Sequence, residues 1–265
     1  MTTAVLAVRA RRPAALPEPL AAPARALRTG FRSPALQISP VAQSLFFLLI
    51  YSGQLGQVGA GYLDGRSFIA FLLPLILLTG VAPGAGAAGT LTVNDLTSGY
   101  LDRLRIAHGT ATPFLTGTVL ATVLAVTGEG ILTIGGAMVA GYRPSTWAGT
   151  LGMLGVMLVL GVTVALFSVA VAVRTSSSSA AGLVTLVFFG LSFFTGVFAP
   201  VSELTGWMRA IATVNPLTYV VEAARQIESG GALSAGPAAT IFLTTLAVAG
   251  FVACGLALHH ARRNR

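Results

Sequence analysis

The chain contains no lysine, and charged residues of all kinds make up only 9% of its 265 residues. All sixteen basic residues are arginine, against eight acidic residues. A P-loop needs the lysine of Gly-x-x-x-x-Gly-Lys-Ser/Thr, because that side chain reaches the nucleotide phosphates. The chain therefore cannot supply this kind of ATP site by itself.

The scarcity of charge also excludes a soluble domain, in which charged residues make up roughly a quarter of the sequence. Hydrophobic residues make up 54% of this chain, and the mean hydropathy is +0.82. The apolar residues form runs of about twenty, enough to cross roughly 30 Å of hydrocarbon as a helix. The alternating pattern of a transmembrane barrel is absent. We therefore expect an all-α integral membrane protein.

Two regions are expected along the chain. Residues 1–34 are rich in arginine and proline and predict a cytoplasmic tail, with a short interfacial helix from about Ala24 to Arg32. Residues 35–265 form the membrane domain, for which we expect six spans at about 41–61, 67–89, 111–140, 147–173, 180–200 and 238–259. An even number of spans places both termini on one side of the membrane.

The distribution of arginine predicts the orientation. With the N-terminus inside, twelve arginines lie in cytoplasmic segments and four lie outside, namely Arg66, Arg143, Arg209 and Arg225. Aromatic residues then fall near the outer interface, namely Tyr62, Tyr142, Trp147 and Trp207. The net charge of +8 reports this bias rather than nucleic-acid binding, since no basic patch is interleaved with aromatic residues.

Between the second and third spans, apolar residues recur at helical spacing, namely Val93, Leu96, Tyr100, Leu101 and Leu104. Polar residues occupy the other face, including Asp95, Asp102 and Arg105. This pattern predicts a short amphipathic helix on the cytoplasmic side. It either lies in the headgroups or docks on a cytoplasmic partner.

Small residues recur within the spans. Gly80 and Gly84 are spaced four apart in the second span, followed by Gly86 and Gly89, and the fourth span contains Gly149, Gly152 and Gly155. Small residues let helices approach closely in lipid, and packing within one chain is favoured over a dimer interface. The single cysteine, Cys254, has no partner in the chain and reads as a packing residue.

The segment before the last span predicts an external pair of short helices. Asn215 followed by Pro216 is a strong helix start, because Asn caps free amides and Pro at the first position loses no hydrogen bond. Tyr219, Glu222 and Arg225 then follow at intervals of three, so that Glu222 and Arg225 can pair.

One acidic residue, Glu129, is expected within a span, between Gly128 and Gly130. An ionisable group in the membrane is costly and indicates function by default. The alternative is a carboxyl group that lies in water at the outer end of the span, or one that is neutral and hydrogen-bonded.

These motifs resemble those of the transmembrane permease subunits of ABC type-2 exporters, in particular the actinobacterial daunorubicin-resistance-like branch. The resemblance covers roughly residues 40–260. It rests on Phe193-x-x-Gly196-x-Phe198-x-Pro200, Gly206-Trp207, Asn215-Pro216-x-x-Tyr219-x-x-Glu222-x-x-Arg225 and the cytoplasmic Asp95-x-x-x-Gly99-x-Leu101-x-x-Leu104-Arg105.

The resemblance implies an ATP-driven exporter subunit for a hydrophobic drug-like or lipid-like molecule. Two copies of a separate ATPase would bind ATP and Mg²⁺, and a second permease copy or paralogue would complete the complex; this chain would hold no catalytic residue, cofactor or metal. The residues implied to couple to the ATPase are Asp95, Leu101, Asp102, Leu104 and Arg105. Those implied to form an external gate or re-entrant hairpin are Phe198, Pro200, Trp207, Asn215, Pro216, Tyr219, Glu222 and Arg225, and Glu129 is expected on the substrate path.

Two other functions compete with this reading. A secondary transporter working alone usually needs several intramembrane ionisable groups, whereas Glu129 is nearly alone here and inverted repeats are not evident. An intramembrane enzyme is weakly supported, because no His/Glu metal spacing occurs within a span.

Overall fold

The protein is described by a computed structural model, which covers residues 34–60, 67–108, 112–196, 201–231 and 236–263. The described residues are helical and contain no strand. The expected tail and its interfacial helix, from about Ala24 to Arg32, lie outside this part of the chain. The all-α prediction is confirmed for the described residues.

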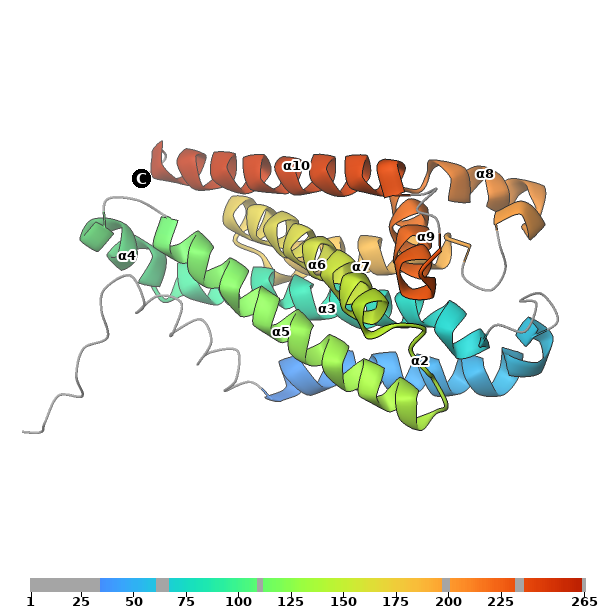
Figure 1. Ribbon diagram of the computed structural model, residues 1–265. Coiled ribbons are helices and arrows are strands. Elements are labelled where there is room, and N and C mark those ends of the chain that lie inside the picture. Colours follow the sequence, from blue (N-terminus) through green and yellow to red (C-terminus); the bar gives the residue numbers. More distant parts are fainter. Residues whose placement is uncertain (1–33, 61–66, 109–111, 197–200, 232–235, 264–265) are drawn as a thin grey trace, which may run out of the picture.

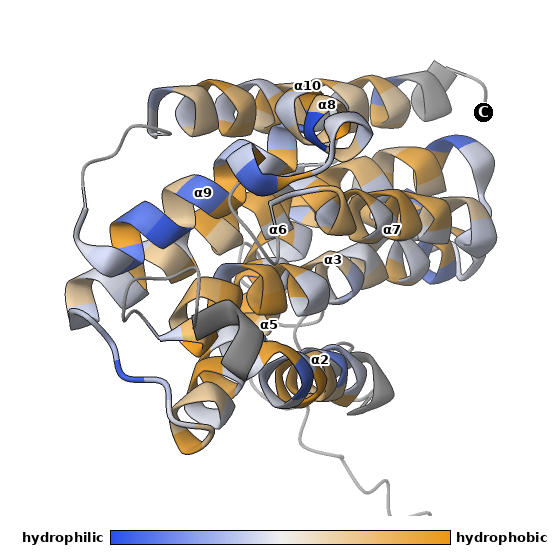
Figure 2. Ribbon diagram, turned by 90° about the vertical axis from the view of Figure 1, so that its right-hand side faces the viewer, coloured by the Kyte–Doolittle hydropathy of each residue, from blue (hydrophilic) through white to orange (hydrophobic). Residues whose placement is uncertain are grey.

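Among the described residues, five helices are long and apolar enough to cross a membrane. They are α2 (Pro34–Ala60), α3 (Phe68–Thr97), α5 (Thr112–Val139), α6 (Trp147–Thr175) and α10 (Gly236–Arg263). They run lengthwise through the molecule and form a bundle (Figure 1). Apolar residues cover most of their surface, and hydrophilic stretches are visible on α9 (Figure 2). The protein is thus a multi-pass membrane protein.

The fifth expected span, at 180–200, corresponds to a shorter helix. Helix α7 (Ser178–Phe193) has 16 residues, which is about 24 Å of helix against roughly 30 Å of hydrocarbon. A turn through Gly196 follows it, and residues 197–200 lie outside the described part. The described part of α7 is thus shorter than a full span.

The remaining elements lie at the two ends of the bundle. Helix α4 (Tyr100–His108) lies at one end, and α8 (Gly206–Val214) and α9 (Pro216–Ser229) lie at the other (Figure 1). A short 3₁₀ turn, η1 (Val201–Glu203), precedes α8. Two candidate functional regions, α4 and the α8–α9 pair, therefore lie at opposite ends of the bundle.

Helix α3 is the centre of the bundle and packs against α2, α5, α6, α7 and α9. An uninterrupted run of its residues, Leu72 to Val81, is buried. A helix that is apolar on all sides suits either lipid or a packed interior, and the burial of α3 shows that here other helices surround it. Helix α3 is therefore the central helix against which the other spans pack.

Glycines allow this close packing. A Cβ at Gly86 would overlap the Thr185 hydroxyl of α7, and one at Gly89 would overlap Ser168 of α6 and Ala181 of α7. The Ser168 hydroxyl also lies 2.9 Å from the carbonyl oxygen of Gly86. Packing within one chain, the favoured interpretation of these small residues, is confirmed for both glycines. Cys254 is buried, as expected of a packing residue.

Candidate functional site

The joint between α8 and α9 is held by Asn215, as the sequence predicted. Its Oδ1 accepts a hydrogen bond from the amide of Leu217 at 3.0 Å, and Pro216 occupies the first helical position. The side-chain amide also donates to the carbonyl oxygens of Leu191 (2.8 Å) and Phe194 (3.2 Å). Asn215 therefore caps α9 and also ties it to the end of α7, a second role that the local pattern did not reveal.

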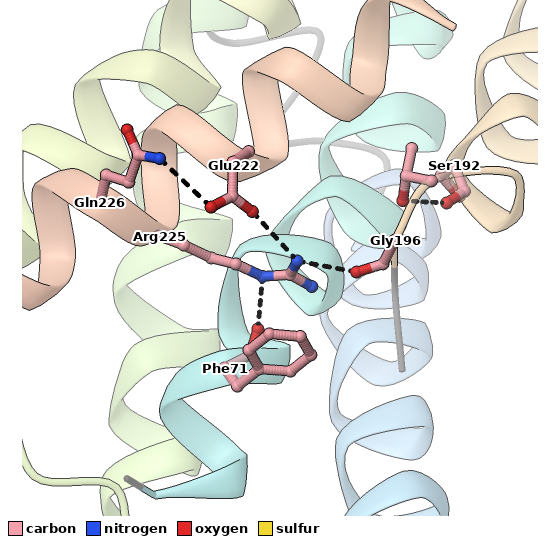
Figure 3. A network of polar contacts seen from close by, with 7 residues as sticks. Phe71, Ser192, Gly196, Glu222, Arg225 and Gln226 are labelled. Carbon is pink, nitrogen blue, oxygen red and sulfur yellow. Dashed lines mark hydrogen bonds and ion pairs between the residues drawn. The ribbon is translucent and has the colours of Figure 1, made fainter. Parts of the chain in front are cut away.

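Arg225 connects α9 to two other segments (Figure 3). Its Nε donates to the carbonyl oxygen of Phe71, near the start of α3, at 2.9 Å, and its guanidinium lies 3.8 Å from the centroid of the Phe71 ring. Its Nη1 donates to the carbonyl oxygen of Gly196, after α7, at 2.7 Å. A buried guanidinium is tolerated when its donors are satisfied in this way.

The predicted pair between Glu222 and Arg225 is present, at 3.6 Å between Oε2 and Nη1. The side chain of Arg225 is 10% exposed, whereas that of Glu222 is 45% exposed. Glu222 also accepts a hydrogen bond from Gln226 at 3.2 Å. The half-exposed carboxylate thus balances the charge of Arg225 from the solvent side of α9.

The other predicted residues of this region lie apart from Arg225. The Tyr219 hydroxyl donates to the carbonyl oxygen of Thr213 at 2.7 Å, and its ring stacks on Phe242 of α10 with centroids 5.1 Å apart. Trp207 of α8 is exposed. Phe198 and Pro200 lie outside the described residues.

A buried carboxylate on α9, Glu228, was not anticipated. Its Oε1 accepts hydrogen bonds from the Tyr142 hydroxyl at 2.8 Å and from the amide and hydroxyl of Ser145, each at 3.3 Å. The Tyr142 hydroxyl also lies 3.0 Å from that of Thr150. Glu228 lies four residues after the buried Ala224, and this position on the apolar stripe of α9 is the signal that could have indicated it.

Tyr142, which was expected near the outer interface, has a fully buried side chain. It lies between α5 and α6, outside both spans. Burial, with a smaller contribution from the Glu228 carboxylate, raises the pKa of Tyr142 to about 12. The neutral hydroxyl thus remains a donor to Glu228 at physiological pH.

Glu129 lies inside the bundle, at the contact between α2, α3 and α5. Its side chain is 6% exposed, which excludes the alternative of a carboxyl group in water. Oε1 accepts hydrogen bonds from Thr133 at 3.0 Å and from Ser44 of α2 at 2.9 Å. The carboxyl group also lies against Gly80 of α3, where a Cβ would overlap both Oε1 and the Ser44 hydroxyl.

At the opposite end of the bundle, the expected amphipathic helix is divided. Gly99 has φ +67°, which ends α3 and lets α4 begin in a new direction. Asp95 therefore lies in the last turn of α3, while Asp102 and Arg105 lie in α4; the side chain of Arg105 is outside the described set.

The two apolar residues implied to couple to an ATPase lie in the core. Leu101 and Leu104 are 1% and 8% exposed and pack into the hydrophobic cluster of the bundle. Ile106, by contrast, is 85% exposed, and Arg103 is exposed and donates to the carbonyl oxygen of Ser98. Leu101 and Leu104 thus fix the position of α4. Its outer surface is formed by Asp102, Arg103 and Ile106.

Comparison with known proteins assigns these features to a family. A sequence model described as ABC-2 type transporter matches residues 21–229. The chain is 28% identical to the daunorubicin resistance ABC transporter permease protein DrrB1 of Streptomyces coeruleorubidus, over 78% of this chain and 74% of that protein. It is 23% identical to the probable doxorubicin resistance ABC transporter permease protein DrrC of Mycobacterium tuberculosis, over 73% and 70%. It is 24% identical to the putative transport permease ycf38 of Porphyra purpurea, over 75% and 69%.

Proposed function

The chain belongs to the ABC-2 type transporter family, and on that premise we propose that it is the membrane subunit of an ATP-driven exporter for an apolar, drug-like or lipid-like molecule. The observation that carries this proposal is the family match over most of the membrane domain. Two relatives are named as a daunorubicin resistance permease and a probable doxorubicin resistance permease, and these names support a drug-like substrate. The chain is a transport subunit rather than a catalytic one.

The energy comes from a separate subunit. The chain has no lysine with which to build a P-loop, so ATP and Mg²⁺ bind to a partner ATPase present in two copies. A second permease copy or paralogue completes the translocation path. Closure of the ATPase dimer shifts the permease between states that differ in the packing of its helices.

Coupling to the ATPase takes place through α4, with both chain termini on the cytoplasmic side. Asp102, Arg103 and Ile106 offer two charges and one apolar side chain on the outer surface of α4. Leu101 and Leu104 transmit the force, because their burial joins α4 to the bundle. Asp95 and Arg105 flank this surface.

Closure of the external end is assigned to the α8–α9 pair. Helix α7 is short for a span. Asn215 donates a hydrogen bond to the backbone of the last turn of α7, and Arg225 donates one to the carbonyl oxygen of Gly196, shortly after α7. This contact supports a re-entrant arrangement, in which α9 fills the depth that α7 leaves open. Trp207, Tyr219, Glu222, Phe198 and Pro200 belong to the same external gate.

The test is affinity purification of the tagged chain from its native host in mild detergent. We expect a P-loop ATPase in stoichiometric amounts with the chain. The control is an unrelated multi-pass protein of the same host, tagged in the same way, which should recover none. An intact chain that is repeatedly recovered without an ATPase contradicts the proposal.

A stand-alone secondary transporter is the second candidate. The buried Glu129 favours it, since carriers driven by ions use intramembrane carboxyl groups. The same purification separates the two, because a secondary transporter copurifies with no ATPase and transports in vesicles that lack ATP.

A further inference from the structure

The two carboxyl oxygens of Glu129 have different surroundings. Oε1 accepts hydrogen bonds from Ser44 and Thr133. Oε2 is buried and has no hydrogen-bond partner among the described residues. A buried polar atom without a hydrogen-bond partner destabilises the fold by on the order of 1–3 kcal/mol. A ligand that donates a hydrogen bond to Oε2 would remove this cost.

A small pocket adjoins this carboxyl group. It is lined by three helices, through Pro40, Gly80, Val81, Gly84, Ala125, Val126 and Glu129. Glu129 is the one polar side chain among these lining residues. Its cavity volume is about 10 Å³, roughly the space that one water-sized group needs. The pocket therefore accommodates a functional group rather than a whole molecule.

Two glycines create this space. At Gly80, a Cβ would occupy the place of the carboxyl group, so the absence of a side chain admits Glu129 between α2 and α3. At Gly84, a Cβ would meet the ring of Pro40 at an ordinary contact distance of 3.5 Å, so a methyl group fits there. An alanine could therefore pack at position 84, and the glycine leaves that space empty.

The residues that line the pocket determine which kind of ligand it can bind. Divalent cations such as Mg²⁺ and Ca²⁺ need six or more oxygen ligands, and one carboxylate oxygen in an apolar pocket does not provide them. An anion would be repelled by the carboxylate. An ammonium group donates hydrogen bonds and neutralises a carboxylate, and its attraction to Glu129 is strong where water is excluded.

We propose that this pocket binds the protonated amino group of an otherwise apolar substrate, with Glu129 Oε2 as its acceptor and counter-ion. Ser44 and Thr133 hold Oε1, which fixes the carboxyl group and leaves Oε2 for the ligand. The apolar body of the substrate lies outside the pocket. The inference rests on the proposed export function and specifies its substrate class.

The test measures binding to the purified permease in lipid nanodiscs, without ATPase. The probes are a fluorescent planar aromatic primary amine and its N-acetyl amide, which share one apolar body. We expect at least tenfold tighter binding of the amine at neutral pH. Glu129→Gln keeps an oxygen for Ser44 and Thr133 but removes the charge, and it should abolish that preference while leaving amide binding unchanged.

Two matched pairs of variants separate charge from shape. Glu203→Gln removes an exposed carboxylate at η1 and should keep the preference for the amine. Gly84→Ala should weaken binding of the amine severalfold, whereas Gly155→Ala in α6, where a Cβ meets nothing within 4 Å, should not. Equal binding of the two probes by the wild type, an unchanged preference in Glu129→Gln, or full amine affinity in Gly84→Ala overturns the proposal.

Failure of the amine site and failure of the proposed export function give different results. Recovery of an ATPase together with equal binding of both probes overturns the amine site and leaves the exporter in place. Preference for the amine in a chain that recovers no ATPase supports the site and contradicts the exporter.

Discussion

Arg225 in α9 donates a hydrogen bond from Nε to the carbonyl oxygen of Phe71, near the start of α3, and its guanidinium lies over the Phe71 ring. The same guanidinium bonds to Gly196, after α7. One side chain thus joins α9, the central helix α3 and the end of α7. Its motion relative to α3 requires that buried charge-assisted bonds be broken, so α9 moves together with the start of α3.

Replacement of Arg225 is expected to destabilise the end of the bundle that holds α8 and α9. Arg225→Ala leaves the two carbonyl oxygens without their donor and removes the ion pair with Glu222, at a cost of about 3 kcal/mol. Arg225→Lys keeps the charge but not the planar fork, and should cost less. Thermal unfolding in nanodiscs measures both. Arg174→Ala, an exposed residue in the last turn of α6, is the control and should change stability little; similar losses in both alanine variants would contradict a structural role of Arg225.

The bond between Tyr142 and Glu228 should appear as coupling in a double-mutant cycle. Tyr142→Phe and Glu228→Gln each disturb the 2.8 Å hydrogen bond. We expect a coupling free energy of about 1.5–3 kcal/mol, because hydrogen bonds to charged groups contribute this much. Denaturation of the two single variants and the double variant gives this value, and strictly additive losses would show that the contact does not stabilise the fold.

Tyr142 also predicts a loss of stability at high pH. Its pKa is about 12 in the folded protein and about 10 in an unfolded chain. The stability that this shift contributes is therefore fully present below pH 10 and is lost as the pH rises toward 12. The unfolding temperature of the wild type should fall more steeply across this window than that of Tyr142→Phe. Parallel curves for the two proteins would refute the prediction.

Gly80 should tolerate no side chain. Gly80→Ala places a Cβ where Glu129 and Ser44 lie, and overpacking of this kind costs about 1–3 kcal/mol. Gly128→Ala is the matched control, since a Cβ there meets nothing within 4 Å and the residue lies next to Glu129 in the chain. Thermal unfolding of the two variants compares them, and equal stability would contradict the close contact of α3 with Glu129.

Charge reversal on α4 should weaken recovery of the ATPase. Asp102→Arg combined with Arg105→Asp inverts the charges of the proposed docking surface, and we expect at least fivefold less ATPase per permease with unchanged membrane insertion. Glu203→Arg, at the other end of the bundle, should have no effect. Unchanged recovery in the α4 variant would refute its docking role.

Local patterns predicted local features well. Asn215 and Pro216 were correctly predicted to begin a helix, and Glu222 and Arg225 were correctly predicted to pair, because each depends on residues within one turn of the other. The amphipathic pattern around Asp95 to Arg105 was divided by Gly99, whose positive φ ends α3. Leu101 and Leu104 could not be placed from the pattern, since an apolar stripe fits a partner, a membrane surface or the core of the same chain equally well.

The sequence by itself determined that the chain is an all-α membrane protein without a P-loop, because span length, composition and the absence of lysine need no knowledge of distant contacts. Only the tertiary structure decided what the buried polar residues do. Arg225 reaches Phe71 across 154 positions of the chain, Glu228 reaches Tyr142 across 86, and Glu129 reaches Ser44 across 85. A buried charge or polar group must find its partner wherever the packing of helices brings one, and no periodicity within a single helix encodes that partner.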